Sequence, residues 1–235
     1  MKRLFSIFQP KLDESIRTRV DGWRHLPDQS LDNPLEKQSL VVVDVETSGL
    51  DIRRDSLLSI GAVRMEGLSI SMGRVFHRFL RQEKGGSKEN VLVHGITHEQ
   101  QAAGDPEPEV LLDFLEFAGK SPLVAFHAPF DQTFLKRYMK THLGLGFNNP
   151  FLDLAWLMPA LVPVENSKLV GLDEWLKKFG ISVNVRHSAE EDAMVTAELL
   201  LIALARARQQ GRNNLNELIE LARSRQLDHS QGGRG

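Results

Sequence analysis

The chain contains no cysteine among its 235 residues. This absence excludes disulfide frameworks, zinc sites built from thiolates and catalysis by a cysteine nucleophile, and it fits a reducing compartment. The formal net charge is only −2, so a broad basic surface is absent as well, and any contact with nucleic acid has to be local. Hydrophobic residues make up 41% of the chain, which is enough for a sizeable core.

Long apolar runs are also missing. The first ten residues are basic at their start but lack the apolar core of a signal peptide. No stretch approaches the roughly 20 apolar residues that cross a membrane. We therefore expect a soluble, cytoplasmic protein without a membrane partner.

Several catalytic signatures are absent too. The chain has no GxxxxGK phosphate loop and no GxSxG nucleophile turn. Gly144-Leu145-Gly146 is a fragment of a dinucleotide-binding motif without its third glycine. We expect neither a nucleotide cofactor nor a serine nucleophile of these types.

Two acidic residues, Asp44 and Glu46, lie inside an apolar run that reads Leu-Val-Val-Val-Asp-Val-Glu from residue 40. On a strand, residues two apart point to the same face, so the two carboxylates would lie side by side. Two like charges on a buried strand are costly unless a cation lies between them. Oxygen ligands favour a hard cation such as Mg²⁺ or Mn²⁺. The pair indicates metal-dependent phosphate chemistry.

The order of predicted elements indicates an α/β fold. We expect strands over 40–46, 57–65, 70–80, 123–126 and 151–154, the first three forming an antiparallel meander with a turn at Glu66-Gly67. Helices are predicted over 12–23, 109–118, 131–142, 155–161, 172–179, 189–209 and 214–226. This order implies a mixed five-stranded sheet flanked by helices.

We expect three regions along the chain. Residues 1–38 form an N-terminal extension that wraps the core or meets a partner. Residues 39–210 form the main domain, and residues 211–235 form a C-terminal helix with a disordered tail from residue 228.

Asp131, His187 and Asp192 are further candidates. Asp131 begins a predicted helix after an apolar strand, where an aspartate also suits the helix dipole. His187 and Asp192 flank Ser188 and Glu191, which we expect to form a capping box at the start of the long helix. The capping box leaves His187 and Asp192 without an explanation.

Four acids and one histidine in the order Asp-x-Glu, Asp and His-x₄-Asp resemble the DEDDh family of 3′→5′ exonucleases. This DnaQ-like group has a ribonuclease-H-like fold and includes the proofreading epsilon subunit of bacterial DNA polymerase III. The resemblance runs from about residue 39 to residue 208. Five segments match in order, at 44–50, 94–97, 130–135, 172–181 and 187–193. The family usually carries His-Asn in the second motif, where this chain has Phe126 and His127.

The resemblance implies a site with two Mg²⁺ or Mn²⁺ ions. Asp44, Glu46 and Asp192 would hold the first ion, Asp44 would bridge to the second, and Asp131 would help to position that one. His187 would take a proton from the attacking water, because an imidazole with an ordinary pKa of about 6.5 suits a base near neutral pH. The expected product is a nucleoside 5′-monophosphate.

The resemblance also implies where a substrate would bind. The expected partner is the 3′ end of single-stranded DNA or RNA, and a polymerase or another protein could dock on the N-terminal extension. Gly49 would let the backbone approach the terminal sugar, and Leu50 would contact the last base. The predicted substrate contacts are Thr47, Ser48, Gly49, Leu50, His94, Ile96, His127 and Phe130.

Basic residues gather around the first strands, and the pattern allows two interpretations. They could follow a phosphate backbone, or they could form an ordinary solvated face. The residues are Arg53, Arg54, Arg74, Arg78, Arg81, Lys84 and Lys88.

Two other functions stay open. A phosphohydrolase with an aspartate nucleophile at a strand end usually carries Asp-x-Asp, and it gives the spacing of His187 and Asp192 no role. A non-catalytic, polymerase-associated module that binds nucleic acid is the second alternative, and the complete set of acids argues against it.

Overall fold

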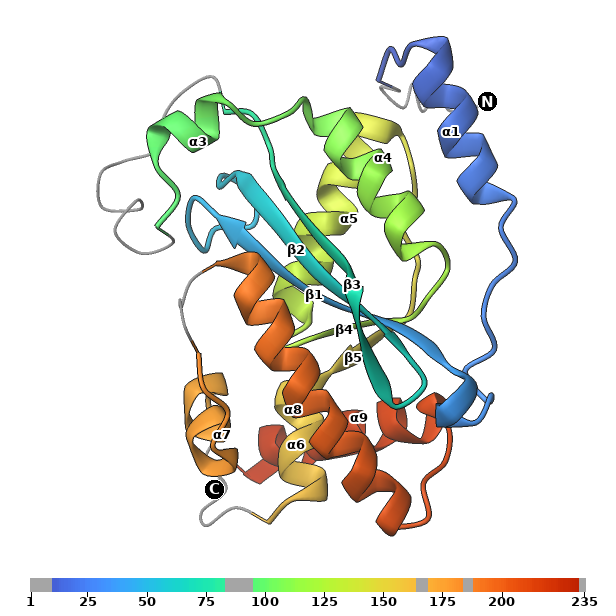
Figure 1. The fold of residues 1–235 in the computed structure, drawn as a ribbon, viewed down its shortest axis with the longest axis vertical. Coiled ribbons are helices and arrows are strands. Elements are labelled where there is room, and N and C mark those ends of the chain that lie inside the picture. The colour runs from blue at the N-terminus through green and yellow to red at the C-terminus, as the bar shows by residue number, and fades with distance from the viewer. Residues whose placement is uncertain (1–9, 83–94, 164–168, 184–187, 233–235) are drawn as a thin grey trace, which may run out of the picture.

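The computed structural model describes residues 10–82, 95–163, 169–183 and 188–232. At its centre lies a five-stranded sheet in the order β3-β2-β1-β4-β5 (Figure 1). The strands are β1 (Ser39–Thr47), β2 (Leu57–Glu66), β3 (Ser69–Phe79), β4 (Leu123–Ala125) and β5 (Phe151–Asp153). β1 pairs antiparallel with β2 and parallel with β4. The predicted mixed sheet is confirmed.

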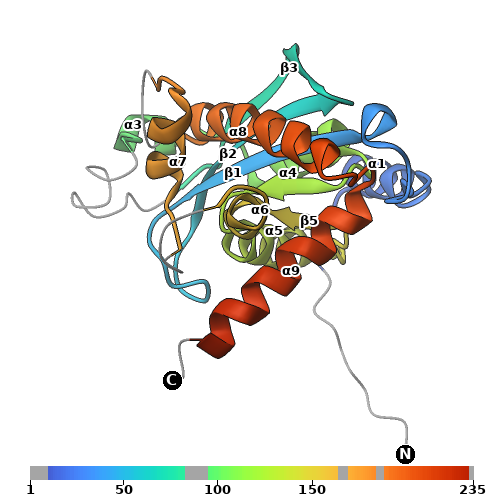
Figure 2. The same cartoon turned by 90° about the horizontal axis from the view of Figure 1, so that it is seen from below.

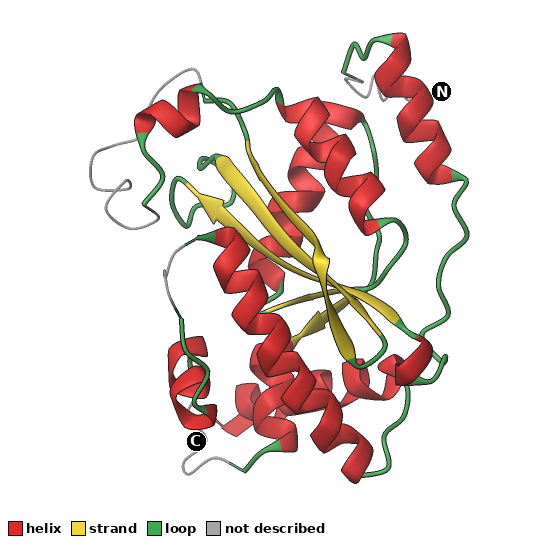
Figure 3. Cartoon of the chain, viewed as in Figure 1, coloured by secondary structure: helices red, strands yellow, loops and turns green. Residues whose placement is uncertain are grey.

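Helices surround this sheet (Figure 3). They are α1 (Glu14–Arg24), α3 (His98–Ala102), α4 (Glu107–Ala118), α5 (Pro129–Leu143), α6 (Leu154–Leu161), α7 (Leu172–Phe179), α8 (Ala189–Gln209) and α9 (Leu215–Gly232), with a 3₁₀ turn at Leu35–Lys37. The bounds of α7 and α8 are those predicted, and α7 ends at Gly180 in the left-handed conformation that favours glycine.

Two helical segments differ from the sequence prediction. The short helix α3 was not predicted, although Thr97 and Gln100 form a capping box at its start. Helix α9 continues to Gly232, so the disorder predicted from residue 228 is wrong for 228–232. The ring of His229 lies 5.2 Å from that of Trp156 in an edge-on contact, which gives this last part of α9 a partner on α6.

Alternating side chains of β1 separate two apolar layers. Val41, Val43 and Val45 face α4 and α5, whereas Leu40 and Val42 face α6, α8 and α9. Figure 2 shows α8 lying along the sheet and α9 running past α6. Asp44 and Glu46 continue the row of Leu40 and Val42, so their side chains belong to the face that α8 covers.

The N-terminal segment packs on the core. Helix α1 lies against α4, where Arg19 forms ion pairs with Asp113 at 2.8 Å and Glu116 at 2.7 Å. Trp23 is buried, and its indole N–H donates to the carbonyl of Gly119 at 2.9 Å. None of the described helices combines the length and the apolar character needed to cross a membrane.

Candidate active site

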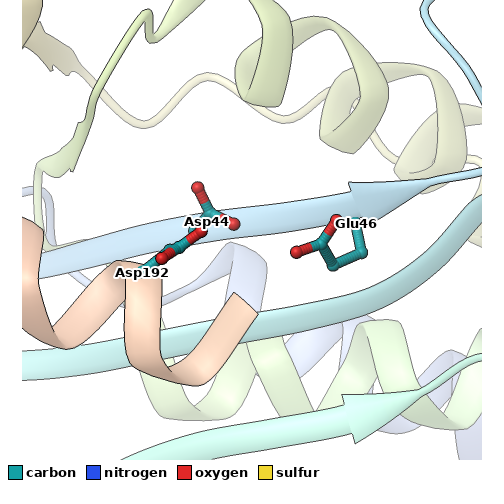
Figure 4. Close-up of side chains that lie close together, drawn as sticks. All are labelled: Asp44, Glu46 and Asp192. Atoms are coloured by element: carbon teal, nitrogen blue, oxygen red, sulfur yellow. The ribbon is translucent and has the colours of Figure 1, made fainter. Parts of the chain in front are cut away.

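Three acidic side chains converge at the centre of the sheet. Asp44 and Glu46 project from β1, as the alternation predicted, and Asp192 reaches them from the first turn of α8 (Figure 4). One ligand atom from each carboxylate lies within 4.8 Å of the others. Asp192 is buried and the other two are half-buried. An all-oxygen set at this spacing fits a hard divalent cation.

Asp131 lies beside this group of three. It is 4% exposed in the first turn of α5, and its Oδ1 accepts a hydrogen bond at 3.1 Å from the backbone N–H of Val45, between Asp44 and Glu46. Burial raises the pKa of Asp131 to about 8, and the nearby Asp153 and Glu46 add to the rise, against backbone N–H groups that lower it. A cation nearby would favour the ionised form.

His127 adopts an unusual backbone conformation at the end of β4. Its φ is 65°, the left-handed region, and its side chain is exposed. Asparagine, aspartate and histidine are enriched in this conformation, so His127 can adopt the turn at the place where the resembling family carries asparagine. Asp153 supports the turn, because its Oδ1 accepts from the backbone N–H groups of His127 and Ala155, each at 3.1 Å.

The loop after β1 is held by hydrogen bonds of its own. The hydroxyl of Thr47 donates to the carbonyl of Gly49 at 2.8 Å, and that of Ser48 donates to Asp55 Oδ1 at 3.0 Å. A Cβ on Gly49 would lie 2.5–2.8 Å from the carboxylate of Asp55, so glycine is needed here for a contact within the protein. Leu50 is 84% exposed at the tip of the loop.

The remaining predicted substrate residues differ in accessibility. Ile96 is buried, and Phe130 is half-buried with its ring 4.9 Å from that of Phe134 in the core. His94 and His187 lie outside the described residues. The substrate roles of all eight predicted contacts and the catalytic role of His187 stay predictions.

Two other sequence predictions concern neighbouring elements. Ser188 is the N-cap of α8, as expected, but its side chain makes no cap hydrogen bond, so the predicted capping box with Glu191 is wrong. Within the basic cluster, Arg78 forms ion pairs with Asp105 and Asp113, which neutralises part of the charge locally.

Sequence reasoning missed three residues that support the site. They are Asp55, Asp153 and Gly61, the last of which lies in β2 under the first turn of α8. A glycine inside an apolar strand often marks a close approach of another backbone, so the sequence did carry a signal for Gly61. The aspartates lack such a signal, because aspartate is common in turns and at helix N-termini.

The mixed sheet, with acids on its central strand and on a helix that packs against it, defines a nuclease domain of the ribonuclease-H-like type. A family model described as exonuclease matches residues 41–200. The chain belongs to this exonuclease family, and the family predicted from the motifs is confirmed.

Curated relatives agree with this assignment. The epsilon subunit of DNA polymerase III from Aquifex aeolicus is 31% identical over 166 residues, covering 69% of this chain and 79% of that protein. An epsilon-like protein of Rhodobacter capsulatus is 33% identical over 77% of this chain and 26% of its own length. A PolC-type DNA polymerase III from Thermotoga petrophila is 31% identical over 82% of this chain, which spans 14% of that polymerase.

Solved structures support the fold. E. coli exonuclease I in complex with single-stranded DNA superposes with a TM-score of 0.65 at 18% identity, covering 74% of this chain and 42% of that one. Exonuclease X in complex with 5′-overhanging duplex DNA gives a TM-score of 0.61 at 20% identity, covering 78% of this chain and 99% of that one. These similarities confirm the predicted ribonuclease-H-like fold.

Proposed function

We propose that the protein is a metal-dependent 3′→5′ exonuclease that hydrolyses phosphodiester bonds at nucleic-acid 3′ ends and releases nucleoside 5′-monophosphates. The observation that carries the proposal is the convergence of Asp44, Glu46 and Asp192, with ligand atoms within 4.8 Å of one another, in a chain of the exonuclease family. The proposal also gives the spacing of His187 and Asp192 a role, which the phosphohydrolase alternative does not.

The donor set suits Mg²⁺ or Mn²⁺, with two ions in the site. Asp44, Glu46 and Asp192 would hold one ion. Asp44 would also bind the second ion, which Asp131 would help to position. When bound, two such ions stabilise the charge on the attacking and leaving oxygens of an in-line displacement. Asp131 is held at this place by the N–H of Val45, so its carboxylate is oriented before any ligand arrives.

Side chains of the protein would accept the proton of the attacking water and contact the substrate. His187 precedes the N-cap of α8 in the sequence and would accept the proton of the attacking water, as a general base near neutral pH. Leu50, exposed at the tip of the loop after β1, would contact the terminal base. This loop follows the acids of β1 directly in the chain, through Thr47, Ser48 and Gly49.

The 3′ ends of single-stranded DNA or RNA are the proposed substrates. One structural neighbour is a complex of exonuclease I with single-stranded DNA, and another is a 3′-exonuclease that recognises a histone mRNA stem-loop. A polymerase or another protein partner would use residues 1–38, where α1 turns Val20 and Trp23 to the core and leaves its other side exposed.

The decisive test replaces Asp192 with asparagine. Asp192→Asn keeps the size of the side chain but removes the charge that a cation needs. We expect turnover of 5′-labelled DNA or RNA oligomers with Mg²⁺ or Mn²⁺ to fall more than about 100-fold, since even residues that only support a metal ligand contribute 10–100-fold. Glu198→Gln, at an exposed position on the same helix, is the matched control and should leave turnover unchanged.

Two results would contradict the proposal. One is near-wild-type turnover by a folded Asp192→Asn protein. The other is release of inorganic phosphate in place of nucleoside monophosphates, which would favour the phosphohydrolase.

A further inference from the structure

A row of three residues crosses the antiparallel strands beneath α8. In the register of the sheet, Asp44 on β1 is opposite Gly61 on β2, and Gly61 is opposite His77 on β3. Residues directly opposite on antiparallel strands point to the same face, so all three belong to the face that α8 covers. The row therefore runs from a proposed metal ligand to the outer strand of the sheet.

Gly61 lets the first turn of α8 touch the backbone of β2. A Cβ built on Gly61 would lie 2.1 Å from the carbonyl carbon of Ala189, 2.2 Å from its oxygen and 2.3 Å from the backbone nitrogen of Glu190. All three atoms belong to a helical backbone and cannot rotate away as a flexible side chain could. Any side chain at position 61 would force the turn of helix that carries Asp192 off the sheet.

His77, on the outer strand β3, contacts the same first turn of α8. Its Nδ1 lies 3.2 Å from Oε2 of Glu190, the second residue of α8. The His77 ring also packs on Phe79 of the same strand, with the ring centres 4.7 Å apart, which supports its orientation on β3. The His77 side chain is 22% exposed and that of Glu190 46% exposed, which places the pair at the rim of the helix–sheet contact.

We propose that Gly61 and the His77–Glu190 pair are positioning residues that seat the first turn of α8 on the sheet and thereby set the place of Asp192 relative to Asp44 and Glu46. Gly61 fixes the height of the turn above β2, and the pair fixes its sideways position over β3. Gly61, His77 and Glu190 are not themselves proposed ligands of the cation. The consequence for catalysis rests on the proposed function, whereas the consequence for cation binding does not.

The test measures Mn²⁺ binding to the full chain by calorimetry, independently of turnover. We expect Gly61→Ala to weaken Mn²⁺ binding by about tenfold or more, in the range seen when residues that orient metal ligands are changed. Gly73→Ala is the matched control, because a Cβ at this position on β3 meets nothing within 4 Å. Circular dichroism of the metal-free proteins would show that both variants are folded.

Variants of Glu190 test the pair even where Gly61→Ala impairs folding. Glu190→Gln keeps an oxygen that accepts from His77, whereas Glu190→Ala removes it. We expect Glu190→Ala and His77→Ala to weaken Mn²⁺ binding several-fold and Glu190→Gln to retain most of the wild-type affinity. Equal losses in the glutamine and alanine variants would show a simple effect of charge and overturn the role of the pair.

The outcomes separate this inference from the proposed function. A folded Gly61→Ala protein with wild-type Mn²⁺ affinity would overturn the inference, even if the wild type is an active nuclease. Weakened Mn²⁺ binding by Gly61→Ala, in a protein whose wild type degrades neither DNA nor RNA, would support the inference and overturn the proposed function.

Discussion

His127 occupies the left-handed backbone region, which the short side chain of asparagine can stabilise by local hydrogen bonds. A left-handed φ of 65° brings the Cβ close to the backbone, a conformation that costs most residues roughly 1–2 kcal/mol and asparagine less. The exposed imidazole makes an edge-on contact with the ring of Phe126 at 5.0 Å. The side chain therefore has little packing to lose, and the cost of the backbone conformation should dominate.

We expect His127→Asn to raise the free energy of unfolding by about 0.5–1 kcal/mol, measured by urea denaturation of the metal-free protein. His127→Ala removes the same ring but lacks the side-chain amide that favours the left-handed region. A gain from the alanine variant as large as that from asparagine would show that the ring, and not the backbone, is unfavourable here.

At the scale of elements, Asp55 organises the connection between β1 and β2. Its carboxylate accepts from the hydroxyl of Ser48 at 3.0 Å and from the backbone N–H of Asp51 at 2.7 Å. Arg137 on α5 donates to the carbonyl of Asp55, and the hydroxyl of Tyr138 accepts from the N–H of Leu57 at 2.8 Å. Helix α5 thus anchors the loop that follows the acids of β1.

The contact between Gly49 and Asp55 predicts a coupling that a double-mutant cycle can measure. Gly49→Ala should lower the free energy of unfolding by about 1–3 kcal/mol, because its Cβ would lie 2.5 Å from Asp55 Oδ2 and overpack the loop. In an Asp55→Ala background the same substitution should cost much less. Additive effects in thermal unfolding of the four proteins would rule out this contact as the cause.

Local patterns in the sequence predicted the elements well. The alternation in 40–46 placed Asp44 and Glu46 on one face of β1, and Gly180 marked the end of α7, because both features depend on residues close together in the chain. Gly61 inside an apolar strand signals that some backbone comes close, but its partner Ala189 lies far away in the chain, so no local pattern identifies that partner. The place of Asp192 in the site was predicted from the family resemblance. No pattern of neighbouring residues predicts it.

At the scale of the whole molecule, α1 is part of the folded core. Trp23 is buried near Phe147, with the ring centres 6.1 Å apart, and Lys120 Nζ lies 3.3 Å from the centre of its indole. The predicted extension thus contributes a large aromatic residue to the apolar layer of α4 and α5.

We expect Trp23→Ala to lower the global free energy of unfolding by about 3–5 kcal/mol, as for other buried tryptophans. Arg19→Ala, on the same helix but in partly exposed ion pairs, should cost less than about 1 kcal/mol. Urea denaturation followed by fluorescence and circular dichroism checks both values. A separate early transition in the wild type, with Trp23→Ala leaving the main one unchanged, would mean that α1 folds independently of the core.

The placement of Asp192 on α8 also has a consequence for protein synthesis. Asp44 and Glu46 leave the ribosome with β1, whereas Asp192 emerges later, with α8. The full set of carboxylates is therefore complete only after α8 has been made and has docked on β2. A nascent chain that stops before α8 therefore lacks one of the three carboxylates that converge in the folded domain.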